Sequence, residues 1–342
     1  MYIHQHTCIS PQQKNGAVHP EEINITADGK LLATEPVLEG IPPAMLRRMS
    51  KAVRMGIGTG LPLLKNNAAD GIIIGTANGG MEDCIKFLNQ IIDYDEGLLT
   101  PANFVQSTPN AIAGQLSQIT KNRSYNATHV HSGLAFENAL LDAQMLIGEH
   151  PGKSYLVGGV DEISSYNYNI DCHAGWYSRT KTNEHLYTDK TPATIAGEGA
   201  AMFIINANPV NALAQIKAVS IFHSTDPKTV ADRFKNFIAE WVPVTDNTIF
   251  LSGENGDFRQ KPLYESCEEV FGSAIPVARF KHVTGEYPTA SSFALWLACH
   301  ALKEQSLPPH FYKNEHNLSQ VDRIIIYNQY QGKQHSFIFV TR

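Results

Sequence analysis

Short apolar runs that alternate with amphipathic helical segments constrain the fold of this chain most strongly. The run Gly71–Gly75 reads Gly-Ile-Ile-Ile-Gly and has no polar side chain, as expected of a strand buried on both faces of a sheet. Two glycines follow at Gly79 and Gly80, and residues 81–92 then carry apolar side chains at helical spacing. This succession predicts an α/β architecture in which most of the sheet is buried.

The same succession begins again after Asn206-Ala-Asn-Pro209. Residues 216–222 have a strand pattern, 231–241 a helical pattern and 248–251 a second strand pattern. This repetition predicts two pseudo-duplicated halves, an amino-terminal half over 1–208 and a carboxyl-terminal half over 209–342. The other segments expected to be strands are 2–10, 125–130, 154–158, 200–205, 323–327 and 336–340, and the other expected helices are 42–64, 111–119, 135–147 and 288–302.

The composition indicates a globular protein without a broad basic face. The chain has 342 residues, 43% of them hydrophobic, and a net charge of −6, so a nucleic-acid partner is not expected. No apolar run approaches the roughly 18 residues that a membrane span requires. The five cysteines are scattered, without a Cys-x-x-Cys pair or a leader segment before them, which predicts a reduced, cytoplasmic compartment.

Four sequence blocks carry a resemblance to a known family. They are Lys281-His-Val-Thr-Gly-Glu-Tyr-Pro288 with the apolar helix after it, Ile195-Ala-Gly-Glu-Gly-Ala-Ala-Met202, Phe104-Val-Gln-Ser-Thr-Pro-Asn110 and Gly158-Gly-Val-Asp161. In this order and spacing they resemble the β-ketoacyl-acyl-carrier-protein synthases, the condensing enzymes (ketosynthases) of the thiolase fold. The opening segment, 3–11, is a weaker match.

The resemblance implies a thiolase-like five-layer αβαβα fold. It also implies a dimer in which the segment 104–113 reaches the pocket of the partner. Neither a cofactor nor a metal is implied. The acyl pocket that the family has would be lined in this chain by Phe104, Ser107, Thr108, Thr284 and Asn328.

The nucleophile of the family is missing from this chain. The family places a cysteine at a tight turn from strand to helix, where the helix amino terminus lowers the pKa of the thiol. The corresponding turn region here is 128–136, called the elbow below. Aligned without gaps between Gly114 and Gly158, the preferred register, the cysteine falls on Gly133, whereas a register that pairs the Ser-Gly motifs places it on Val130. Neither residue offers a nucleophile.

The two family histidines are also replaced. The segment 250–257, which resembles the block with the first histidine, contains none, and Glu286 stands at the position of the second. A carboxylate there would repel a developing enolate oxygen unless it is protonated. Lys281 and Thr284 of the same block are retained. The resemblance therefore implies a ketosynthase scaffold without the Cys-His-His set that condensation requires.

Several residues allow more than one interpretation. Gly133 marks either a widened pocket, with room for an acyl chain or a prosthetic arm, or only a turn. His129 and His131 alternate along the expected strand and would share a face. Because no third ligand is evident, a hydrogen-bonded pair is expected there rather than a metal site. Glu286 can form a buried ion pair with Lys281 or with His131.

A basic helix face stands out on this acidic chain. Arg47, Arg48, Lys51 and Arg54 lie close together in the expected helix 42–64. Their position resembles that of the helix by which elongating ketosynthases bind an acidic carrier protein, which implies a carrier-protein docking site. The alternative is a solvated helix face, as most charge runs are.

The preferred hypothesis is a non-condensing ketosynthase homologue that works with an active ketosynthase, as chain-length factors do. Degenerate proteins of this kind accompany aryl polyene and flexirubin-type pathways, and the sequence resembles them. The expected partners are an acyl carrier protein and either an active ketosynthase, in a heterodimer, or a second copy of this chain.

Two other functions stay open, so the sequence leaves undecided whether the chain is an enzyme. One is an active acyltransferase or thioesterase in which Ser132, His131 and Glu286 form a Ser-His-Glu arrangement. The other is a homodimeric acyl-binding protein without a catalytic partner. A degradative thiolase is disfavoured, because it too would need cysteines at the elbow and near the end of the chain.

Overall fold

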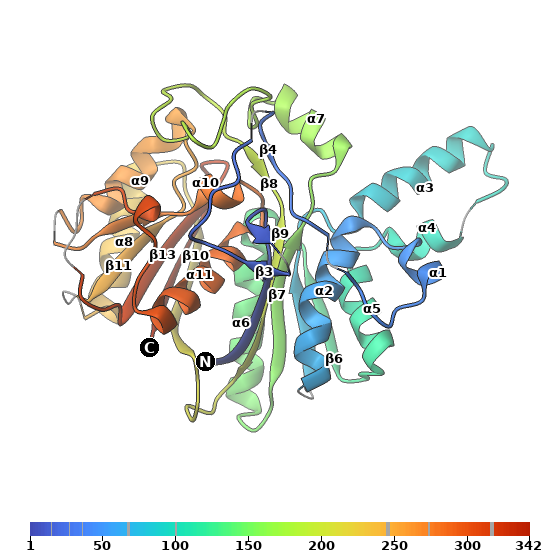
Figure 1. Cartoon of the computed structure of the whole chain (residues 1–342), viewed down its shortest axis with the longest axis horizontal. Coiled ribbons are helices and arrows are strands. Elements are labelled where there is room, and N and C mark those ends of the chain that lie inside the picture. The colour runs from blue at the N-terminus through green and yellow to red at the C-terminus, as the bar shows by residue number, and fades with distance from the viewer. Residues whose placement is uncertain are drawn as a thin grey trace.

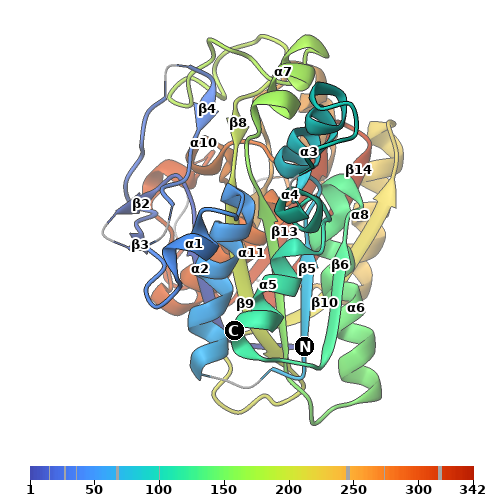
Figure 2. The ribbon, with the colours of Figure 1, turned by 90° about the vertical axis from the view of Figure 1, so that its right-hand side faces the viewer.

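The computed structural model describes residues 1–14, 16–26, 28–35, 37–66, 69–99, 101–243, 247–272, 274–314 and 318–342. Within these ranges, ten strands form one hydrogen-bonded sheet. Figures 1 and 2 show the strands in the middle of the molecule with helices around them.

Five strands make up the amino-terminal half of the sheet. They are β1 (Tyr2–Ile9), β5 (Gly71–Gly75), β6 (Tyr125–His129), β7 (Tyr155–Asp161) and β9 (Gly199–Asn206). Their order in the sheet is β1-β9-β7-β5-β6. β5, β6 and β7 are parallel, and β9 runs antiparallel to both β7 and β1.

The other five strands repeat this arrangement. They are β10 (Ala214–His223), β11 (Thr248–Ser252), β12 (Val277–Arg279), β13 (Arg323–Tyr330) and β14 (Gln334–Thr341). Their order, β10-β14-β13-β11-β12, and their directions match those of the first half strand for strand. A short pairing of β1 with β10 joins the two halves. The repeat confirms the predicted pseudo-duplicated α/β fold, whereas the division at 208/209, in the connection between β9 and β10, stays a prediction.

Helices cover the outer face of each half and also lie between the halves. Three large clusters of buried apolar side chains fill the space between these layers. Along Figure 1 the layers follow one another from side to side, which is the expected thiolase-like αβαβα arrangement. The central helices are α6 (Ala135–Glu149) and α11 (Ala290–Glu304). The outer helices of the first half are α2 (Lys51–Asn66) and α5 (Ala111–Thr120). The outer helices of the second half are α8 (Pro227–Trp241) and α9 (Lys261–Glu268).

The remaining elements are shorter or more peripheral. α3 and α4 project from the body of the molecule (Figure 1). Among the described helices, none is long and apolar enough to cross a membrane. The elements are helices α1 (Pro43–Leu46), α3 (Met81–Asp93), α4 (Pro101–Gln106), α7 (Ser165–His173) and α10 (Lys281–Thr284), 3₁₀ turns η1 (Ser132–Leu134), η2 (Phe258–Gln260) and η3 (Pro309–Phe311), and strands β2 (Gln13–Lys14), β3 (Ala17–Val18), β4 (Lys30–Leu31) and β8 (Ala196–Gly197).

Local sequence explains how the elements around the site begin and end. β5 is buried along its whole length, as its apolar run predicts. Gly75 at its end lets α6 approach, because a Cβ there would lie 2.6 Å from the carbonyl carbon of Ala135. The single helix predicted over 42–64 is wrong: the chain forms α1, turns, and starts again at α2. The restart has a physical cause, since the Val53 N–H donates to Ser50 Oγ at 3.5 Å, as in a helix N-cap.

Candidate functional site

The elbow lies between β6 and α6. β6 ends at His129, and Ser132 has a positive φ of 50°, which non-glycine residues rarely adopt. The chain then passes through η1 into α6, and the Gly133 N–H donates to Gln334 Oε1 at 2.8 Å. The structure therefore has a strained turn from strand to helix within 128–136.

No pocket opens at Gly133. The residue is buried, and a Cβ added to it would lie 2.1 Å from Cβ and 2.5 Å from Cγ of Tyr330. Side-chain carbons do not approach so closely in a packed interior, so the Tyr330 side chain already occupies this space. The interpretation of Gly133 as a widened pocket is wrong, because Tyr330 at the end of β13 packs directly against the elbow.

Glu286, which the resemblance places at the position of the second family histidine, forms a buried ion pair with Lys281. The Nζ of Lys281 is 2.5 Å from Oε1 of Glu286, and Asn255 Nδ2 donates to Oε2 of Glu286 at 2.9 Å. Lys281 is 0% exposed and Glu286 is 3% exposed. Burial raises the pKa of Glu286 and lowers the pKa of Lys281, and the contact between the two groups opposes both shifts. Of the two partners that the sequence allows for Glu286, the structure has Lys281.

Aromatic side chains close this centre. The Tyr177 hydroxyl donates to the backbone oxygen of Glu286 at 3.2 Å, and Trp176 and Tyr330 line the same cavity. The volume of the cavity is about 10 Å³, which is room for a single water molecule. An acyl chain therefore has no space beside Glu286 in this conformation of the single chain.

A second buried carboxylate faces the same core. Glu137, on α6, is 0% exposed, and its Oε1 accepts a hydrogen bond from Ser336 Oγ at 2.7 Å. Burial raises the pKa of Glu137, and the positive charge of Lys281 acts in the opposite direction. Sequence reasoning missed this residue, although its spacing of three from Leu140 places it on the apolar face of the expected helix.

The structure does not assemble the Ser-His-Glu arrangement. His131 is exposed, and its ring packs edge-on against His223 with 5.6 Å between the ring centroids. Among the described residues, no hydrogen bond joins Ser132, His131 and Glu286. The carboxylate of Glu286 instead accepts a hydrogen bond from Lys281 in the interior of the molecule.

His129 and His131 have different partners. The Nε2 of His129 is 2.9 Å from Oδ2 of Asp142, and the Tyr125 hydroxyl donates to the same oxygen at 3.0 Å. The prediction of a hydrogen-bonded His129–His131 pair is wrong, because β6 ends before His131 and the alternation of side chains ends with it. In the described ranges, no group of three or more His, Cys, Asp or Glu side chains could hold a metal ion.

The residues expected to line an acyl pocket lie in two separate places. Phe104, on α4, is 59% exposed, and Ser107 and Thr108 form the turn after it, where Ser107 Oγ donates to the Phe104 carbonyl at 2.7 Å. Thr284, on α10, and Asn328, on β13, are buried. The cavity beside α4 and the cavity beside Glu286 share no lining residue.

The predicted docking residues differ in their availability. Arg47 and Arg48 are exposed in the turn after α1. Lys51, in contrast, forms an ion pair with the buried carboxylate of Glu198. Arg47 and Arg48 are therefore exposed cations on this face, while Lys51 already has a partner within the chain.

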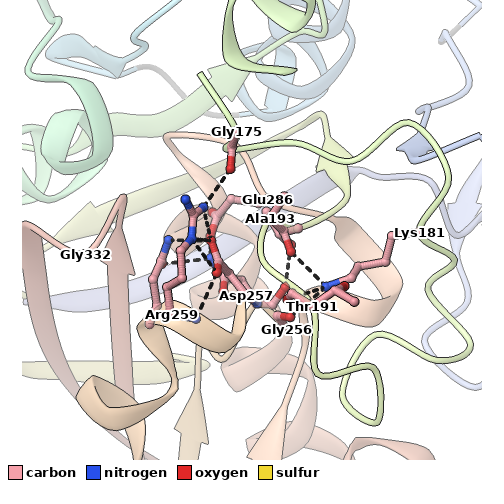
Figure 3. A network of polar contacts seen from close by, with 12 residues as sticks. Gly175, Lys181, Thr191, Ala193, Gly256, Asp257, Arg259, Glu286 and Gly332 are labelled. Carbon is pink, nitrogen blue, oxygen red and sulfur yellow. Dashed lines mark hydrogen bonds and ion pairs between the residues drawn. The ribbon is translucent and has the colours of Figure 1, made fainter. Parts of the chain in front are cut away.

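A polar network beside the centre was not predicted. Arg259 Nη2 donates to Oδ2 of Asp257 at 2.5 Å and to the carbonyl of Gly175 at 2.6 Å (Figure 3). Lys181 lies in the same network. These contacts tie the connection between α7 and β8 to the loop after β11. Local sequence gives no signal for them, because they join segments that are distant along the chain.

The two repeated sheet halves and the central helix pair define a thiolase-like fold. Residues 25–173 match the family model described as the beta-ketoacyl synthase N-terminal domain. This part of the chain is therefore similar to the amino-terminal domain of the β-ketoacyl synthases. No protein with a curated description matches it significantly.

Solved ketosynthase structures share the whole fold at low sequence identity. A β-ketoacyl synthase from Burkholderia phymatum is 12% identical, with a TM-score of 0.81 over 100% of this chain and 98% of its own. The ketosynthase ApeO in complex with its chain length factor ApeC, from Xenorhabdus doucetiae, is 13% identical, with a TM-score of 0.77 over 99% of this chain and 97% of its own. A type II polyketide ketosynthase in complex with its acyl-carrier protein is 14% identical, with a TM-score of 0.74 over 99% and 98%. Identities this low establish the fold alone.

Proposed function

We propose that this chain is a non-condensing, chain-length-factor-like partner of an active ketosynthase that elongates acyl chains on a carrier protein. One observation carries the proposal: Gly133, the position at which we expect the nucleophile of the family, lies packed against the Tyr330 side chain. The alternative position, Val130, is 52% exposed and is equally unreactive.

The rest of the centre supports the same conclusion. Condensation requires a thiolate and two imidazoles that stabilise the enolate as it forms. This centre has instead the buried Lys281–Glu286 pair and the amide of Asn255. A carboxylate held by an internal lysine and enclosed by aromatic rings stabilises the scaffold and offers no donor to an enolate.

One face of the chain suits a ketosynthase-like partner. β6 is the last strand at its end of the sheet, so its outer edge has no strand partner within the described chain. Figure 2 shows β6 with α3 and α4 on the same side of the molecule. Leu88 and Ile92 of α3 and Phe104 and Val105 of α4 are 51–74% exposed. A free strand edge beside exposed apolar side chains supports a protein–protein interface.

A carrier protein would dock at Arg47 and Arg48. Both guanidinium groups are exposed on a chain of net charge −6, so they form a local positive site for an acidic partner. Binding through exposed charges should weaken as the ionic strength rises.

The proposal also includes the kind of biosynthetic pathway and the cellular compartment. The sequence resembles the degenerate ketosynthase-like proteins of aryl polyene and flexirubin-type pathways, and we place the chain with them. We also place it in the cytoplasm, where its five cysteines, all unpaired in the structure, would stay reduced.

Co-purification with a candidate ketosynthase and a carrier protein from the same organism tests the proposal. We expect a stable heterodimer, and we expect Phe104→Asp to abolish it because the charge would be buried in the interface. Val210→Asp is the matched control, since Val210 is similarly exposed (63%) in the connection between β9 and β10. No complex with the native chain, or equal loss with both variants, would overturn the partner proposal.

A further inference from the structure

Lys181 is buried, and none of the described carboxylates forms an ion pair with it. It lies in the connection between α7 and β8, called the strap below (174–195), and is 5% exposed. Its Nζ donates to the carbonyl oxygens of Ala193 at 2.8 Å, Gly256 at 2.9 Å and Thr191 at 3.2 Å (Figure 3). The three N–H groups of the ammonium are thus matched by three acceptors.

The ammonium of Lys181 is surrounded by uncharged backbone carbonyls, which are the kind of ligand that binds monovalent cations in proteins. Rings of backbone carbonyls replace the hydration shell of K⁺, whereas divalent cations are usually held with carboxylates. No carboxylate of the described residues forms an ion pair with Lys181, and Asp189 and Asp257 act on it only through space. Burial lowers the pKa of Lys181, which is the expected effect of removing an ammonium from water.

The backbone that supplies these carbonyls is held in unusual conformations. Ala193 has a φ of 69° although it is not a glycine, and Gly256 has a φ of 75°. A Cβ at Gly256 would lie 2.2 Å from the carbonyl oxygen of Leu186. Two of the three acceptors therefore come from positions that the fold forces into the left-handed region, which indicates a site built for its occupant.

The site adjoins the Glu286 centre. Gly256 follows Asn255, which donates to the Glu286 carboxylate, and Thr194 of the strap donates to the Asn255 carbonyl. Trp176 and Tyr177 of the same strap line the cavity of that centre. The hydrogen bonds of Lys181 therefore join the strap, which covers the Glu286 centre, to the loop after β11.

We propose that the three carbonyls form a monovalent-cation site that the chain fills with its own Lys181 ammonium, so that the strap stays closed over the Glu286 centre without an ion from solution. Removing the side chain should leave a site that binds K⁺ or an alkylammonium ion of matching size. The inference concerns the construction of the strap and does not depend on the proposed partner function.

Chemical rescue of Lys181→Ala tests this inference. The substitution removes the atoms from Cγ to Nζ, which correspond to n-propylammonium. Thermal unfolding would be followed at constant ionic strength in tetramethylammonium chloride, with KCl, LiCl or n-propylammonium chloride replacing part of it. We expect the Tm to fall by at least about 5 °C, and to recover along a saturable curve with K⁺ and n-propylammonium but not with Li⁺.

Two controls separate charge from packing. Lys181→Met restores the bulk of the side chain without its charge, and should stay destabilised and unresponsive to every cation. Lys190→Ala removes an exposed lysine of the same strap, and should behave as the native chain does. Equal responses of all variants to all salts, or Lys181→Met as stable as the native chain, would overturn the inference.

A measurement on the native chain keeps the inference testable if neither Lys181 variant folds. An ammonium with three buried hydrogen bonds exchanges its protons slowly, so NMR at neutral pH should show a protected NH₃⁺ signal with nuclear Overhauser contacts to Thr191 and Ala193. Absence of such a signal would contradict the site.

Discussion

Removing one partner of the Lys281–Glu286 pair should destabilise the chain more than removing both. Glu286→Leu leaves the Lys281 ammonium 0% exposed, and among the described carboxylates Glu137 is then the one that acts on it. An uncompensated buried charge of this kind costs about 3–5 kcal/mol of unfolding free energy. Lys281→Met should cost less, because burial already raises the pKa of Glu286 and the carboxylate can take up a proton.

The double variant Lys281→Met/Glu286→Leu replaces the pair with apolar side chains of similar volume. Such replacements are often close to neutral, so we expect the double variant to be about 2 kcal/mol or more stable than Glu286→Leu. Urea unfolding monitored by circular dichroism measures the four free energies of the cycle.

Lys303→Met is the matched control for this cycle. Lys303 pairs with Glu304 at 3.3 Å, but its side chain is 65% exposed, and an exposed pair is worth at most about 1 kcal/mol. If Glu286→Leu costs no more than Lys303→Met, or if the two substitutions in the centre are additive, the ion pair is not the organising contact of the centre.

Three further predictions concern the elbow and its surroundings. Gly133→Ala should lower the free energy of unfolding by about 1–3 kcal/mol, because the added methyl group overlaps Tyr330. Gly148→Ala is the control: Gly148 is exposed on α6 with open space around it, so this substitution should stabilise the chain slightly. Urea unfolding measures both, and a Gly133→Ala variant as stable as the native chain would contradict the packing. Burial lowers the pKa of His282 to about 3, whereas a histidine in the unfolded chain has a pKa of about 6.5. The unfolded state therefore takes up the proton first, and the stability of the chain should fall as the pH drops from about 6.5 towards 3. The dependence of Tm on pH should therefore be weaker in His282→Gln, and an unchanged slope would refute this. Ser132→Ala should leave any background hydrolysis of acyl thioesters unchanged, and its loss in the variant would favour the acyltransferase or thioesterase alternative.

Sequence patterns predicted the fold well because its signals are local. The apolar run of β5 and the restart after Pro209 are visible in short windows, and both correspond to elements of the two repeated halves. The split of 42–64 into two helices was not foreseen, because the start of α2 is capped by Ser50 and also by Glu162, which is distant along the chain. The early end of β6 at His129 was likewise not foreseen, and it removed the expected histidine pair.

The site was harder to predict because its decisive contacts are distant along the chain. The sequence predicts that Gly133 replaces the family nucleophile. It does not reveal that Gly133 packs against Tyr330, because Tyr330 comes from the other half of the molecule. Glu286 was predicted to replace the second family histidine, and its observed partner Lys281 was one of the two partners that the sequence allowed. Lys181 carried no signal, because its three acceptors are backbone carbonyls that no side-chain pattern reveals.

Malonyl-dependent condensation by the purified chain tests the central claim most directly. The assay compares this chain alone, a ketosynthase from the same organism alone and the two together, each with an acyl carrier protein. The proposed role predicts no elongated product from this chain alone and elongation by the pair that exceeds that of the ketosynthase alone. Elongated product from this chain alone would contradict it.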